Sequence, residues 1–142
     1  KIAEIDGVVG IKEATGDVDR VAAIRESTAE DFILLSGDDP SACAFTFLGG
    51  DGVISVTSNI APRQMSGMMQ AALAGNTIAA RTTHRELRAL FDALFIESNP
   101  IPVKAALAMM NRLQEIYRLP LCPMTPENRL QLDDALRRGG YL

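Results

Sequence analysis

Three short apolar runs dominate the first half of the chain and constrain its fold more than any other feature. They cover residues 8–11, 32–35 and 52–56. None of them alternates polar with apolar residues, and continuous apolar runs of this length are typical of strands buried on both faces of a parallel sheet. The sequence therefore predicts three strands that need helices on their faces.

The segments between these runs have helical signals. Residues 17–27 place Val18, Val21 and Ile24 at helical spacing. Residues 40–48 follow Asp39, a residue type that caps helix N-termini, and Pro40 suits the first helical position. The predicted order is strand, helix, strand, helix, strand, with the right-handed crossovers that parallel strands require.

The second half of the chain shows no further strand pattern. Four helices are expected, at residues 63–73, 77–95, 103–115 and 127–138, and glycine- or proline-containing turns separate them. We therefore predict an α/β part at residues 1–74 and a helical region at residues 75–142. The α/β part fits either a doubly wound open sheet or a portion of a (β/α)8 barrel, and periodicity alone does not choose between them.

Composition and charge exclude several classes of protein. The formal net charge is -4 and the sequence pI is near 4.9, so no nucleic-acid partner is expected. No apolar run approaches the roughly 20 residues that span a bilayer, so no membrane association is expected. Cys43 and Cys122 lack metal-ligand spacing and the chain has a single histidine, which predicts no metal site, no cofactor and two reduced thiols in a cytoplasmic protein.

The beginning of the sequence resembles the inside of a domain. Residues 1–5 have the character of the last turn of a helix, and Gly7 closes that turn just before the first apolar run. We therefore expect the chain to be part of a longer protein.

Lys12 is the first candidate for chemistry, because it follows directly after the first predicted strand. Reactive groups of parallel α/β folds collect at the carboxyl ends of strands. A lysine stem enclosed there loses hydration, and its free amine can then attack a carbonyl group. The simpler alternative is a solvated charge at the point where the chain leaves the sheet.

Glycines mark the ends of the other two strands. Gly37 follows the second strand and allows close approach of the backbone to a ligand, or simply forms a turn before a helix cap. Residues 49–52 precede the third strand and form neither a GxGxxG motif nor a P-loop, so a tight turn is the simpler interpretation. His84 lies in a polar helical stretch and is expected at the surface, without a serine–histidine–aspartate set around it.

Four segments together resemble one known family, the dihydrodipicolinate synthase family of pyruvate-dependent class I aldolases. They are GIKEATG at residues 10–16, LLSGDD at 34–39, GGDGVISV at 49–56 and NPIPVK at 99–104. Each segment alone is weak, but their order and separations also agree with the family. The resemblance covers essentially the whole chain.

The resemblance implies a fold, a reaction and a set of site residues. The fold would be the C-terminal portion of a (β/α)8 TIM barrel, with strands 6 to 8 followed by a helical C-terminal region. Lys12 would form a Schiff base with pyruvate, and the main chain at Gly37 and Ile54 would line the pyruvate pocket. The enamine would then attack L-aspartate-4-semialdehyde in lysine biosynthesis, in a protein expected to form a homotetramer.

The same resemblance also implies what the chain lacks. The proton-relay residues, the pyruvate-carboxylate segment and the lysine feedback site of the family belong to the N-terminal half of the barrel. The chain alone is therefore expected to be inactive and to need that half as a partner. Two other interpretations stay open: another lysine aldolase, such as N-acetylneuraminate lyase, and a non-catalytic assembly fragment.

Overall fold

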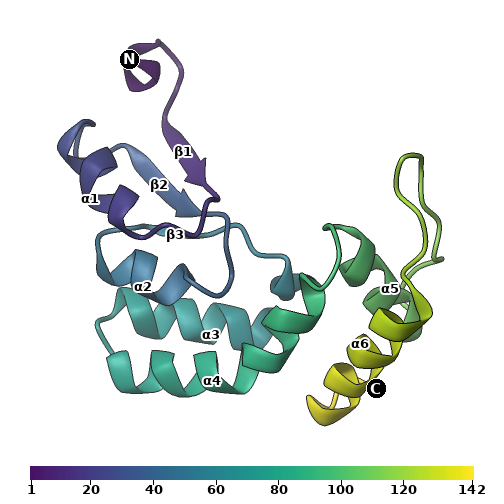
Figure 1. Cartoon of the computed structure of the whole chain (residues 1–142). Coiled ribbons are helices and arrows are strands. Elements are labelled where there is room, and N and C mark those ends of the chain that lie inside the picture. The colour runs from purple at the N-terminus through teal and green to yellow at the C-terminus, as the bar shows by residue number, and fades with distance from the viewer. The chain divides into compact units, whose positions relative to one another are not determined.

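The computed structural model describes residues 1–142 and contains a parallel three-stranded sheet and six α-helices (Figure 1). Two 3-10 turns, at Ile2–Glu4 and Thr57–Asn59, complete the secondary structure. The elements are β1 (Gly10–Glu13), α1 (Asp19–Glu26), β2 (Ile33–Ser36), α2 (Ala42–Phe47), β3 (Gly52–Val53), α3 (Pro62–Leu73), α4 (Thr77–Leu94), α5 (Ile101–Met109) and α6 (Pro126–Arg138).

The sheet has the order β1-β2-β3, and both strand pairs are parallel, which confirms the predicted α/β arrangement. β1 and β2 begin later than their apolar runs, at residues 10 and 33 instead of 8 and 32. β3 ends earlier than its run, at residue 53 instead of 56. Lys12 lies within β1, opposite Leu35 of β2, instead of just beyond the strand. β3 is only two residues long, although the amide of Ile54 still donates to the carbonyl of Ser36 over 2.8 Å.

Helices cover one face of the sheet, which we call the covered face. Leu34 of β2 is fully buried there with Val21 of α1 and Phe45 of α2, and Ile24 packs against this cluster. Because side chains alternate along a strand, Lys12, Ile33 and Leu35 belong to the opposite face. We call that opposite face the open face.

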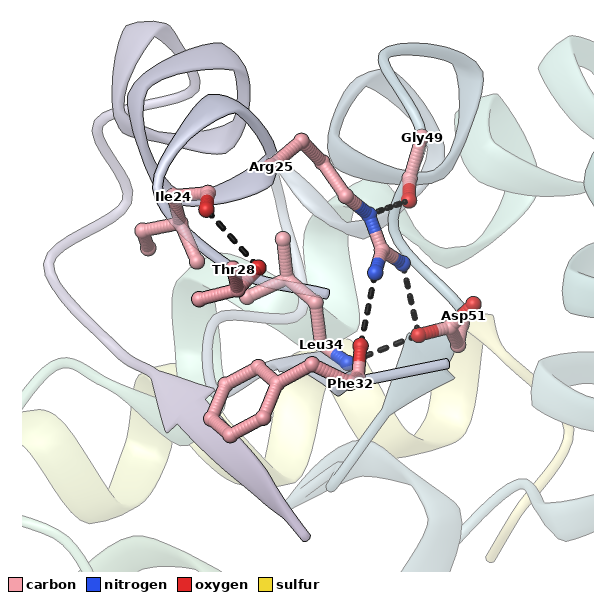
Figure 2. Close-up of polar contacts among 7 residues, drawn as sticks. All are labelled: Ile24, Arg25, Thr28, Phe32, Leu34, Gly49 and Asp51. Carbon is pink, nitrogen blue, oxygen red and sulfur yellow. Dashed lines mark hydrogen bonds and ion pairs between the residues drawn. The ribbon is translucent and has the colours of Figure 1, made fainter. Parts of the chain in front are cut away.

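An arginine on α1 joins the amino ends of β2 and β3 (Figure 2). The Arg25 guanidinium donates to the carbonyls of Phe32 and Gly49 over 2.6 and 2.8 Å, and to Asp51 Oδ2 over 2.7 Å. The same carboxylate oxygen accepts the amide of Leu34 over 2.7 Å. Arg25 and Asp51 thus hold a helix and two strands together at the end of the sheet opposite Lys12.

This contact predicts an acid-sensitive element. Burial alone would raise the pKa of Asp51, but the Leu34 amide and the Arg25 guanidinium outweigh it and hold the pKa below the ordinary value of 3.8. A lowered pKa means that the carboxylate stabilises the fold above pH 3.8 and stops doing so as the pH falls through the folded-state value. We expect the Leu34 amide NMR signal to titrate with a midpoint below 3.8.

Two variants check this assignment. Asp51→Asn should abolish the titration of the Leu34 amide, whereas Asp31→Asn, at an exposed carboxylate nearby in the sequence, should leave it unchanged. A midpoint at or above 3.8 would contradict the prediction.

Two helix boundaries differ from the sequence prediction for identifiable reasons. The helix predicted from residue 40 begins at Ala42, and of the two aspartates that could cap it, Asp38 accepts the amide of Ser41 over 3.0 Å. The helix predicted over 103–115 ends at Met109, because Asn111 has a φ of 56° and starts a Schellman motif. In that motif the amides of residues 111 and 112 donate back to the carbonyls of residues 108 and 107.

The chain divides into two compact units, residues 1–55 with 66–84, and residues 56–65 with 85–142. The predicted boundary between residues 74 and 75 falls within the first unit and stays a prediction. None of the helices is both long enough and apolar enough to cross a bilayer.

Carboxylates organise the second unit. Glu97 accepts the amide and hydroxyl of Thr125, which caps α6, and the side-chain amide of Asn128. Glu115 contacts Arg129 over 2.8 Å and accepts the Tyr117 hydroxyl over 3.0 Å. Burial, followed by this hydrogen bond and the charge of Glu115, raises the pKa of Tyr117 to about 12.

Candidate active site

A groove lies along the open face of the sheet, and Lys12 is its one charged lining residue. Its volume is about 440 Å³. The remaining lining is apolar side chains and glycine: Gly7, Val8, Val9, Gly10, Ile11, Ile33, Leu35 and Ile54. An amine in such surroundings is suited to reaction with a small carbonyl compound, because apolar walls restrict its hydration once the face is covered.

Gly37 lies against the stem of Lys12. A Cβ atom built on Gly37 would come within 2.6 Å of Lys12 Cε and 2.5 Å of the Ala14 Cβ. Gly37 does not have a positive φ, so the close approach of β1 is the reason a glycine is needed here. The structure thus brings Lys12 and Gly37 together across β1 and β2.

Ile54 lines the same groove from the end of β3. Its side chain is 49% exposed, and that of Ile33 is 44% exposed. The open face is therefore an apolar surface around a single ammonium group. The structure brings the three predicted site residues to one region, while their roles in binding stay predictions.

Glu13 is the residue that sequence reasoning missed at this site. It follows Lys12 in β1, points to the covered face and is 5% exposed. Arg20 Nε lies 3.1 Å from its Oε1, and the Thr15 amide is 3.2 Å from both carboxylate oxygens. The sequence signal that could have identified Glu13 is the alternation of side chains along a strand. If Lys12 faces a site, the side chain of the next residue points to the opposite face, beneath the helices, where a buried charge needs a partner.

The other candidate groups lie elsewhere. His84 is in α4 with its Nε2 2.8 Å from the carbonyl oxygen of Pro40, and it does not line the groove. Cys43 and Cys122 are both free, and burial raises the pKa of the Cys43 thiol. No group of three or more histidine, cysteine, aspartate or glutamate side chains is arranged to hold a metal ion.

Comparison with known proteins finds relatives that share one name. The chain is 51% identical over all 142 residues to a 4-hydroxy-tetrahydrodipicolinate synthase from Idiomarina loihiensis, covering 48% of that protein. It is also 51% identical to the enzyme of that name from Methylococcus capsulatus, covering 49% of it. The chain thus spans about half the length of the curated relatives it matches.

A solved structure agrees with these relatives. The dihydrodipicolinate synthase from Acinetobacter baumannii, solved in complex with pyruvate, superposes with a TM-score of 0.93 at 44% identity, over 99% of this chain and 48% of that one. The sequence profile described as the Dihydrodipicolinate synthetase family matches residues 1–138. With all but the last four residues matched, this chain belongs to the Dihydrodipicolinate synthetase family.

Proposed function

We propose that this chain is the lysine-bearing C-terminal part of a 4-hydroxy-tetrahydrodipicolinate synthase. Residues 1–74 would supply strands 6 to 8 of a (β/α)8 barrel, and residues 75–142 its helical C-terminal region. The preceding half of the barrel would come from the same or a partner polypeptide. The complete enzyme would condense pyruvate with L-aspartate-4-semialdehyde in the cytoplasm and would assemble as a homotetramer.

The proposed chemistry begins at Lys12. Its neutral amine attacks the keto carbon of pyruvate, and loss of water leaves a protonated imine. The imine withdraws electrons from the adjacent methyl carbon, so a proton leaves that carbon and an enamine forms. The enamine carbon then forms a new bond to the aldehyde carbon of L-aspartate-4-semialdehyde, and the aldehyde oxygen takes up a proton. Addition of water or of the product's own amino group to the restored imine carbon then breaks the bond to Lys12 Nζ, which releases the product and regenerates the amine.

The observation that carries this proposal is the position of Lys12. It is the one ammonium group in an apolar groove, at the carboxyl end of a parallel strand, with a glycine packed against its stem. Groups at this edge of a parallel sheet meet the ligands of α/β enzymes. The names of the relatives agree with the reaction class that such a lysine supports.

The test requires a complete barrel. We would join this chain to the preceding half of the Idiomarina loihiensis relative, and we call the product the joined barrel. Condensation of pyruvate with L-aspartate-4-semialdehyde would support the proposal. Cleavage of N-acetylneuraminate in place of that condensation would favour the lyase interpretation, and no reaction with either substrate would favour a non-catalytic assembly role.

Gly37→Ala should impair the joined barrel at its site. The added methyl group would collide with Lys12 Cε and with Ala14, and an overpacked position of this kind costs about 1–3 kcal/mol of unfolding free energy. We expect weaker pyruvate binding together with a lower urea midpoint. Binding would be measured by borohydride trapping across a range of pyruvate concentrations.

Gly67→Ala is the matched control for this substitution. Gly67 lies in α3 with open space around the position of a Cβ atom, so the same change should stabilise the helix by roughly 1 kcal/mol and leave pyruvate binding unchanged. Equal effects of the two substitutions on pyruvate binding would reduce Gly37 to an ordinary turn residue.

A further inference from the structure

We propose that Glu13 is a positioning residue for Lys12: its buried carboxylate fixes the end of β1 so that the lysine amine is held in the orientation for attack. The inference rests on the proposed function, since it concerns the alignment of the same amine. Glu13 does not line the groove and so would not touch the substrate. It would act through the backbone that it holds.

The surroundings of Glu13 suit a carboxylate. Its side chain is 4% exposed, and both oxygens face donors: Arg20 on one side and the Thr15 amide between them. A carboxylate accepts hydrogen bonds at both oxygens, whereas a carboxamide must present an NH2 group at one of them. A buried charge is retained only where it is paired and hydrogen-bonded in this way.

These contacts fix the chain directly after the reactive lysine. Through Thr15, the Glu13 side chain closes the turn that follows β1. Through its own carbonyl, Glu13 accepts the amide of Gly37 over 2.6 Å, which ties the end of β1 to the end of β2. On the β1 side, the residues that make these contacts, Glu13 and Thr15, lie within three positions of Lys12 in the sequence.

The same anchors determine what the lysine stem touches. Ala14 and the Lys12 stem both lie against Gly37, so a shift of the strand end would change the space in which Lys12 Cε and Nζ lie. Misplacement of a reacting group by about 1 Å can cost on the order of 100-fold in rate. A residue that prevents such a shift therefore contributes to the rate without contacting the substrate.

The test uses Glu13→Gln in the joined barrel, with Glu26→Gln as the matched control. Glu26 is an exposed residue of α1, so its substitution makes the same chemical change away from the site. Pyruvate at saturating concentration is trapped with borohydride at successive times, and the adduct on Lys12 is quantified by peptide mass spectrometry. The final amplitude counts competent sites, while the rate constant reports how well each site is aligned.

We expect Glu13→Gln to lower the rate constant of imine formation by about 10- to 100-fold, with pyruvate half-saturation changed less than about 2-fold. Arg20→Ala removes a half-exposed partner of Glu13 and should reduce the stability of the fold less than Glu13→Gln does. It should also lower the rate constant, by a smaller factor. Glu26→Gln should match the unaltered joined barrel.

Other outcomes separate the two proposals. A lower amplitude with an unchanged rate constant in both Glu13→Gln and Arg20→Ala would show that Glu13 serves only folding, and would overturn the inference. Equal rate constants for Glu13→Gln and Glu26→Gln would overturn it as well, while leaving the proposed function intact. Absence of any imine in the unaltered joined barrel would refute the proposed function and the inference together.

Discussion

Lys12→Arg in the joined barrel is expected to remove the trapped pyruvate adduct and to lower condensation by on the order of 1,000-fold or more, as removal of a covalent nucleophile does in other enzymes. Arginine keeps the positive charge, but its guanidinium stays protonated and does not form the imine. Arginine also has an unbranched aliphatic stem like that of lysine, which can lie against Gly37 in the same way. Folding should therefore be preserved.

The measurement is borohydride trapping with pyruvate, followed by peptide mass spectrometry. The other lysines of the chain are Lys1 and Lys104, so the peptides that could carry the adduct are well separated. Lys104→Arg is the control, because Lys104 Nζ donates to the carbonyl of Ile116 and lies 5.1 Å from the centre of the Tyr117 ring, in the other compact unit. An adduct on Lys1 or Lys104 in an active joined barrel would disprove the assignment of Lys12.

The second large effect is expected from the chain by itself. The isolated 142-residue chain should be inactive and should self-associate, and addition of the preceding half of the barrel should restore condensation. The open face exposes Ile33 and Ile54 to 44% and 49%, Val9 just before β1 is 69% exposed, and β1 and β3 each have a free edge in the sheet. Free strand edges beside apolar surface promote association between chains.

Covering the open face supplies a driving force for this complementation. Full burial of an isoleucine side chain contributes about 1.5–3 kcal/mol, so Ile33 and Ile54, each about half exposed, would each gain roughly 1 kcal/mol from a partner. The same cover would exclude water from the amine of Lys12 and provide the opposite wall of the groove.

The experiment mixes this chain with the preceding half of the Idiomarina loihiensis relative as separate polypeptides. Sedimentation velocity follows assembly, and condensation of pyruvate with L-aspartate-4-semialdehyde follows activity. The chain carrying Lys12→Arg, mixed with the same half, should assemble equally well without activity. Turnover by the unaltered chain alone, as a monodisperse species, would contradict the prediction and require a different account of the proton relay.

Local patterns in the sequence determined the identity and order of the elements. Continuous apolar runs predicted the three parallel strands, because a strand that is buried on both faces has apolar residues at successive positions instead of an alternating pattern. Helical patterns and start signals predicted all six α-helices, and the prolines and glycines between them marked the turns. The resemblance carried by four short segments predicted the family that residues 1–138 match.

The boundaries were predicted less well, because they depend on backbone contacts that hydrophobicity does not encode. β3 ends at Val53 although its apolar run continues to Val56, since β2 ends at Ser36 and offers no longer partner. The early end of α5 comes from the left-handed conformation of Asn111, which asparagine tolerates but does not require.

Only the tertiary structure decided the surroundings of the lysine. Lys12 was predictable from its place after an apolar run, but its contact with Gly37 depends on the register of β1 against β2, which joins residues 25 positions apart in the chain. The burial of Glu13 likewise depends on α1 folding back to bring Arg20 over the covered face. The spacing of residues in the sequence predicts which side chains share a face of one helix or strand. The partner of a buried charge depends on which helices and strands pack against each other, and the spacing does not predict this.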